Sequence, residues 1–112
     1  MGCYLQIGTR EVTSKNTVCL MKNIILNLFP DLEKEKKSWK LKKKHIAKLI
    51  DWCNILLRDD KILGAYIGRN NIKLGISLTE VRYDVEEINR YFIYTLVDMV
   101  LYKHKFVKVK WI

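Results

Sequence analysis

The segment from Asp84 to Tyr102 has apolar residues around most of a helical circumference. At 100° per residue, its apolar positions cover an arc of roughly 220°. A helix of this kind has to be covered on more than one side. The sequence therefore requires a sheet and other helices around this segment, or a second subunit that makes a homodimer through the helix at residues 85–103. The remaining stripe is only semi-polar and consists of Glu87, Tyr91, Thr95, Asp98 and Tyr102.

Both ends of the chain show the period of two that predicts β-strands. From Cys3 to Gly8, cysteine, leucine and isoleucine alternate with tyrosine, glutamine and glycine. Residues 10–17 then read as a polar connection. In the last eight residues, two valines and Trp111 share one face, while Lys108 and Lys110 share the other. The sequence thus predicts a first strand, and a last strand with a basic face.

Between these strands, the pattern predicts two helices, a hairpin and a third helix. Apolar residues recur at three and four positions over residues 17–29, which indicates an amphipathic helix. A second helix is expected from a cap at Ser38 to about residue 58. Residues 61–78 resemble two strands of a hairpin, the second continuing toward the next helix. Asp84 is expected to cap the third helix.

This order of elements predicts a single α+β domain spanning residues 1–112. With the first two helices counted as one crossover, the order is the ferredoxin-like βαββαβ. Right-handed crossovers would place the helices on one face of a four-stranded antiparallel sheet. The alternative is a winged-helix fold, in which the helix at 38–58 enters a DNA groove and the hairpin forms the wing. That alternative leaves no place for the first and last strands.

The net charge of +9 is concentrated in two segments. Residues 33–48 carry a net charge of +6, and residues 103–110 carry +4, so the rest of the chain is close to neutral. Lysine outnumbers arginine by 16 to 5. Arginine is the usual reader of guanine edges, because its planar fork makes two parallel hydrogen bonds. A lysine-dominated surface instead suits phosphate contacts without sequence readout.

The basic segment at 36–50 predicts a nucleic-acid-binding helix, since its lysines would neutralise phosphates and its tryptophan would stack on a base. The simpler interpretation is a solvated helix face with the tryptophan packed over the core. Lysines of the last strand would extend the surface if the two segments meet. The candidate RNA- or DNA-binding residues are Lys36, Lys37, Trp39, Lys40, Lys42, Lys43, Lys44, Lys48, Lys105, Lys108 and Lys110.

No residue pattern supports a catalytic residue, a metal site or a cofactor. His45 and His104 each lie within a lysine cluster, where positive charge disfavours a bound cation. Asp59 and Asp60 would end the second helix, which is electrostatically unfavourable for acids, and nothing in the spacing brings them to other carboxylates. The five glycines are scattered and form no phosphate-binding loop. A metal-dependent nuclease is therefore only the third function considered.

The cysteine pattern and the hydropathy favour a cytoplasmic protein that does not enter membranes. Three widely spaced cysteines with no C-x-x-C pair argue for a reducing compartment. The most apolar window, Tyr91 to Tyr102, is too short to span a bilayer and contains Asp98. The second function considered is a protein-binding inhibitor or adaptor, of the anti-defence kind that mobile elements encode. Its lysines would dock on an acidic or nucleic-acid-binding protein.

Overall fold

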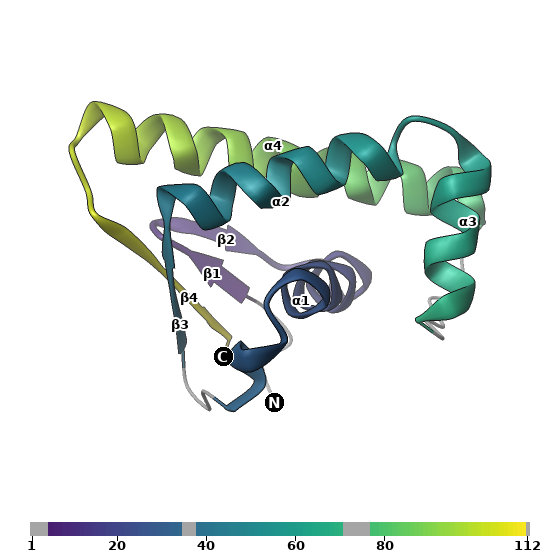
Figure 1. Ribbon diagram of the computed structural model, residues 1–112, viewed down its shortest axis with the longest axis horizontal. Coiled ribbons are helices and arrows are strands. Elements are labelled where there is room, and N and C mark those ends of the chain that lie inside the picture. Colours follow the sequence, from purple (N-terminus) through teal and green to yellow (C-terminus); the bar gives the residue numbers. More distant parts are fainter. Residues whose placement is uncertain (1–4, 35–37, 71–76, 112) are drawn as a thin grey trace.

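In the computed structural model, which describes residues 5–34, 38–70 and 77–111, four strands form one antiparallel sheet (Figure 1). The strand order is β2-β1-β4-β3, so β1 and β4 are central and β2 and β3 are the edges. The first and last strands of the chain therefore lie side by side in the middle of the sheet. The strands are β1 Leu5–Ile7, β2 Arg10–Val12, β3 Ser38–Lys42 and β4 Phe106–Trp111.

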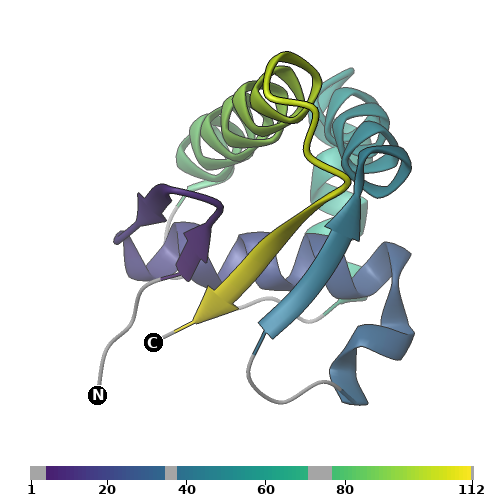
Figure 2. The ribbon, with the colours of Figure 1, turned by 90° about the vertical axis from the view of Figure 1, so that its left-hand side faces the viewer.

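Helices cover one face of this sheet, as Figures 1 and 2 show from two directions. α2 and α4 run beside each other, and α1 crosses below them behind the strands. This arrangement confirms the α+β fold class and the four-stranded antiparallel sheet. The helices are α1 Lys15–Leu28, the 3-10 helix η1 Pro30–Lys34, α2 Lys43–Leu56, α3 Asp60–Arg69 and α4 Leu78–Leu101.

The first predicted strand is confirmed over its described part, β1, but the polar connection that was expected after it contains a second strand. β1 and β2 form a tight hairpin because Gly8 adopts a positive φ of 61°. A Cβ at that position would also lie 3.2 Å from Cγ2 of Val107. Leu5, Ile7 and Val12 point from this hairpin into the core, where each is at most 1% exposed.

The expected start of the second helix, at Ser38, is instead strand β3. Its inward residues Trp39 and Leu41 are 2% and 1% exposed, whereas Lys40 and Lys42 lie on the solvent side. α2 follows without a loop, beginning at Lys43. A strand is favoured here because alternation buries both apolar side chains and separates them from the lysines. A helix would have left the tryptophan and leucine on its projecting end.

The hairpin predicted at residues 61–78 is wrong in its first half, because residues 60–69 form helix α3. Asp59 caps this helix by accepting a hydrogen bond from the backbone N–H of Ile62 at 2.8 Å. Leu63 and Tyr66, three positions apart, are buried against the core. Residues 71–76 of the expected hairpin lie outside the described residues, and the expected continuation of its second strand belongs to α4. The described elements therefore do not confirm the ferredoxin-like βαββαβ order, and they include no hairpin that could serve as the wing of a winged-helix fold.

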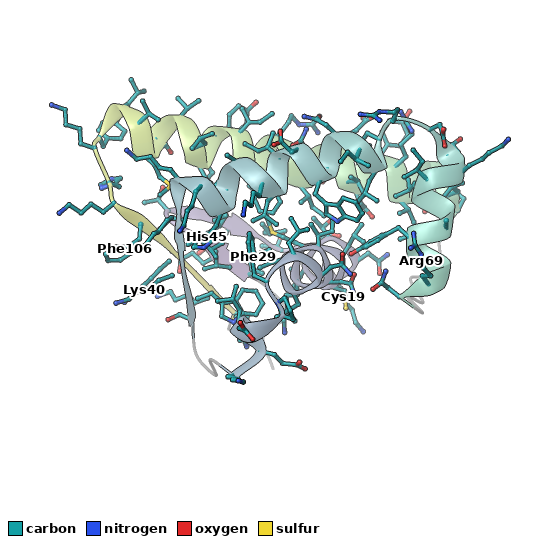
Figure 3. The ribbon with its side chains drawn as sticks, viewed as in Figure 1. Cys19, Phe29, Lys40, His45, Arg69 and Phe106 are labelled. Carbon is teal, nitrogen blue, oxygen red and sulfur yellow. The ribbon has the colours of Figure 1, made fainter. Side chains whose placement is uncertain are left out.

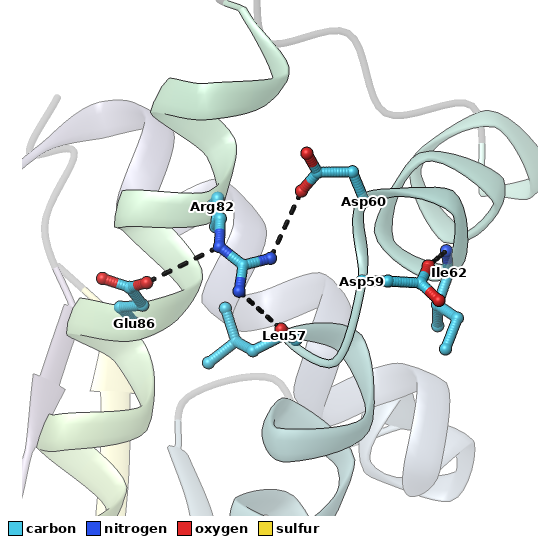
Figure 4. A network of polar contacts seen from close by, with 6 residues as sticks. All are labelled: Leu57, Asp59, Asp60, Ile62, Arg82 and Glu86. Atoms are coloured by element: carbon cyan, nitrogen blue, oxygen red, sulfur yellow. Dashed lines mark hydrogen bonds and ion pairs between the residues drawn. The ribbon is translucent and has the colours of Figure 1, made fainter.

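Arg82 of α4 fixes the junction between α2 and α3, as Figure 4 shows. Its guanidinium donates to the backbone carbonyl of Leu57 at 2.6 Å and pairs with Asp60 at 3.2 Å. Glu86, one turn further along α4, lies 3.7 Å from the Nε atom. The two aspartates, which would have been unfavourable at the expected C-terminus of the second helix, thus have roles at the start of the next helix. Asp59 caps α3, and Asp60 lies in its first turn, where acids are favourable.

α4 begins earlier than predicted, because Ser77 rather than Asp84 is its cap. The Ser77 hydroxyl accepts a hydrogen bond from the backbone N–H of Glu80 at 3.2 Å. Asp84 instead lies within the helix and accepts from the Thr17 hydroxyl of α1 at 3.4 Å. Burial raises the pKa of this carboxyl.

No helix among the described residues is long and apolar enough to cross a membrane.

Candidate nucleic-acid interface

Strands β3 and β4 bring the two basic segments of the sequence together on one face of the sheet. Lys40 lies directly opposite Lys108 in the antiparallel register, and Lys110 lies opposite Ser38. Lys42 lies opposite Phe106. Because side chains alternate along each strand, the residues between them point to the core, and all four lysines point to solvent. The segments are distant in sequence but form one surface.

We call this surface the open face, and define it by Lys40, Lys42, Phe106, Lys108 and Lys110. Figure 3 shows Lys40 and Phe106 on the side of the sheet that faces away from the helices. Phe106 is 49% exposed, and the Lys40 ammonium lies 5.0 Å from the centre of its ring. The open face therefore combines four cations with one accessible aromatic ring.

The positive charge of the open face is not neutralised by acids among the described residues. The ion pairs among the described residues all involve Arg10 or Arg82, and none involves a lysine. The register places Gln6 beside Lys110 on the neighbouring strand β1, and the carboxylate of Glu11 comes only on the far edge strand. Like charges directly opposite each other destabilise a sheet. This arrangement is therefore unfavourable for folding, which is typical of surfaces kept for a function.

Further lysines extend the open face at one end. Lys43 and Lys44 occupy the first turn of α2, immediately after the strand, and both are exposed. Lys105 comes just before Phe106, which pairs with Lys42, so it lies at the same end of the sheet. Seven of the candidate lysines thus belong to the open face or its border.

His45 holds the junction between β3 and α2. Its Nδ1 atom accepts a hydrogen bond from the backbone N–H of Lys42 at 2.9 Å, which requires an unprotonated Nδ1. The Phe29 ring packs against the imidazole in a T-shaped arrangement, with centroids 4.9 Å apart (Figure 3). Burial lowers the pKa of His45 from its ordinary 6.5, and the neighbouring Lys44, Lys42 and Lys48 lower it further. The histidine is structural and keeps the basic strand joined to the helix.

This lowered pKa predicts a stability that depends on pH. Well above pH 6.5 the imidazole is neutral in both the folded and the unfolded chain. As the pH falls, the unfolded chain takes up the proton first, so the free energy of unfolding decreases until the folded pKa is passed. Urea unfolding of the wild type between pH 7 and pH 5 should therefore show a steeper loss than His45→Gln. Glutamine keeps an acceptor for the same N–H but does not titrate. Identical slopes would contradict this role.

The remaining candidates lie elsewhere or cannot be placed. Trp39 is not a stacking residue, because it is buried and its ring packs against Trp111 with centroids 4.4 Å apart. Lys48 lines a separate groove of about 340 Å³ between α1 and α2, beside Phe29 and Trp52. Lys36 and Lys37 lie outside the described residues.

Phe106 is the site residue that the sequence interpretation missed. It lies two and four positions before Lys108 and Lys110, and alternate residues of a strand share a face. The alternation of the last strand could therefore have predicted that Phe106 lies beside these lysines.

The described residues contain no group of three or more His, Cys, Asp or Glu side chains that could hold a metal ion. Comparison of the chain with family models, with curated proteins and with solved structures finds no match. The open face therefore has to be interpreted from its own chemistry.

Proposed function

We propose that the protein binds nucleic acid through the open face, without strong sequence specificity and without catalysing a reaction. The observation that carries this proposal is the register of β3 and β4, which gathers Lys40, Lys42, Lys108 and Lys110 around one exposed aromatic ring. Lysines neutralise phosphates and release counterions, which gives affinity without reading bases. This replaces the expected lysine-rich helix with a surface that is mostly sheet.

Protection of a sheet edge is the simpler explanation, since lysines on edge strands prevent strands of different molecules from pairing. It accounts for Lys40 and Lys42, which lie on the edge strand β3. It does not account for Lys108 and Lys110, because β4 is paired on both sides. The basic character of a central strand favours a binding role over edge protection.

The geometry favours single-stranded over duplex nucleic acid. The open face presents no helix or ribbon that could enter a groove, whereas a basic surface with an exposed ring suits a strand whose bases can stack. Phe106 is the stacking residue in this proposal. Stacking on one aromatic side chain contributes about 1–3 kcal/mol per base.

Fluorescence anisotropy with labelled single-stranded RNA, single-stranded DNA and duplex DNA tests this function. We expect both single strands to bind more tightly than the duplex, and Phe106→Ala to weaken binding of the single strands more than of the duplex. A preference for duplex would contradict the stacking role. No binding even at low ionic strength would contradict the proposal as a whole. The lysines would then fit the inhibitor or adaptor function, with an acidic protein surface as the partner.

A further inference from the structure

The outward face of α4 is apolar over its C-terminal half and is largely exposed, although the Arg10 guanidinium lies 5.1 Å from the centre of the Tyr94 ring. The opposite face of the helix packs against α1 and α2, as the 0% exposure of Phe92 illustrates. The side chains on the outward face are instead 39% to 67% exposed. This apolar patch consists of Ile93, Tyr94, Val97, Val100 and Leu101.

The patch has the spacing of a coiled-coil seam. Tyr94, Val97 and Leu101 follow one another at three and four positions, and the same alternation continues backwards through Arg90 and Glu87. Residues at this spacing face a single partner helix, because seven residues make about two turns. Ile93 and Val100 flank the seam on one side. The exposed face of α4 is thus patterned for another helix rather than being irregularly apolar.

The size of the patch fits the core of a small interface. The exposed fractions of its five side chains correspond to roughly 500 Å², against about 800 Å² per partner in a standard interface. Flanking residues, including the 66% exposed Tyr83, supply the rim. A patch of this size lies in the upper part of the roughly 300–600 Å² range of the largest patch on a typical monomer, and such patches are often functional.

We propose that α4 pairs with α4 of a second copy of this chain, antiparallel, with the two-fold axis between Tyr94 and Val97. In an antiparallel coiled coil the two kinds of seam position face each other. Tyr94 then lies opposite Val97 of the second copy, and Ile93 lies opposite its Val100. Each contact occurs twice, because a two-fold interface uses the same patch on both subunits. Every residue of the apolar patch thereby meets an apolar residue or the aliphatic stem of Arg90.

The charges next to the patch favour this orientation. The antiparallel register brings Arg90 opposite Leu101 of the second copy, at the C-terminal end of its α4, where a cation interacts favourably with the helix dipole. A parallel pairing would place Glu87 on Glu87 and Arg90 on Arg90. Opposite charges across an interface favour a register, and like charges exclude one. The patch is therefore complementary to itself only when the second helix runs in the opposite direction.

Sedimentation velocity tests the pairing. We expect the wild type to sediment as a dimer and Val97→Glu as a monomer, with a dissociation constant raised at least about 100-fold, because each dimer would bury two unpaired carboxylates. Val97 is 47% exposed, so the substitution leaves the fold intact. Ile55→Glu, at a 36% exposed site on α2, is the matched control and should remain dimeric. A wild type that is monomeric at its highest soluble concentration would overturn the proposal, as would a dimer that Val97→Glu leaves unchanged.

Disulfide trapping tests the register, in a background with Cys3 and Cys19 replaced by serine. Mixing Arg90→Cys with Leu101→Cys should give a cross-linked heterodimer, while neither variant should cross-link alone. The antiparallel register separates identical copies of these positions by about 16 Å along the helix axis. A parallel dimer would give the reverse result, with each variant cross-linking alone and no heterodimer, and would overturn the antiparallel assignment. Neither experiment uses nucleic acid, so both outcomes are independent of the proposed function.

Discussion

Replacing Trp39 by alanine is expected to lower the free energy of unfolding by about 3–5 kcal/mol, the range for deleting a large buried aromatic side chain. Trp39 is 2% exposed and packs against Trp111 of β4, so its ring joins the edge strand to the centre of the sheet. Equilibrium unfolding in urea measures the effect. Most natural domains are stable by only 5–15 kcal/mol, so this variant should be close to unfolding.

Two comparisons separate this structural role from a role in binding. Trp39→Phe keeps a ring and removes an indole N–H that has no hydrogen-bond partner among the described residues, so it should be much less destabilising than the alanine variant. Phe106→Ala, at a 49% exposed site, should leave the stability close to that of the wild type. If Trp39→Ala were as stable as the wild type and bound nucleic acid more weakly, Trp39 would be a stacking residue after all. The description of β3 would then be wrong.

Replacing Lys40, Lys42, Lys108 and Lys110 together by glutamine is expected to weaken nucleic-acid binding by roughly 100- to 1,000-fold near 0.1 M salt. For single strands, each phosphate contact contributes about 0.7 to the slope of the logarithm of the binding constant against the logarithm of the salt concentration. The contributions of the four lysines add. The protein should not be destabilised, because Lys40 and Lys108 repel each other across the strands.

The matched control variant removes four positive charges from exposed positions outside the open face. Lys15, Lys34, Lys48 and Lys61 are exposed and lie outside the open face, so their replacement by glutamine gives an equal net charge. We expect this control variant to bind nearly as tightly as the wild type. Equal weakening in both variants would mean that net charge alone governs binding, and the open face would have no special role.

The strands at the two ends of the chain could be predicted from the sequence, because each has a clean alternation that pairs with its neighbour. The described part of the first predicted strand is β1, and the last is β4 with the expected basic face. The helix at 17–29 was also predictable, since its buried residues recur at helical spacing and Pro30 follows it. These elements carry their own signal in the local pattern.

β3 was missed because its stability comes from a partner far away in the sequence. Residues 38–42 alternate like a strand, but the lysines and apolar residues that follow them continue a helical pattern. Their pairing with β4, which decides the outcome, is visible only in the fold. This error changed the predicted site. The lysines expected on one helix face lie instead on two strands, and Trp39, expected to stack on a base, is buried in the core.

α3 was missed because its composition resembles a strand. Residues 61–68 contain two isoleucines, a tyrosine and two glycines, which favour strands and turns over helices. The local signal against a hairpin was Asp59 followed by Asp60, which is an N-terminal helix pattern. Burial of Leu63 and Tyr66 at helical spacing then outweighs the low helix propensity of the two glycines.

The proposed interface is best tested by the salt dependence of single-strand binding, measured for the wild type, the open-face variant and the charge-matched control. Because the four lysines of the open face are proposed to contact phosphate, the log–log slope of the open-face variant should be flatter than that of the wild type by about 3. The control variant should keep the wild-type slope. Identical slopes for the two variants would show that β3 and β4 together do not form the nucleic-acid interface.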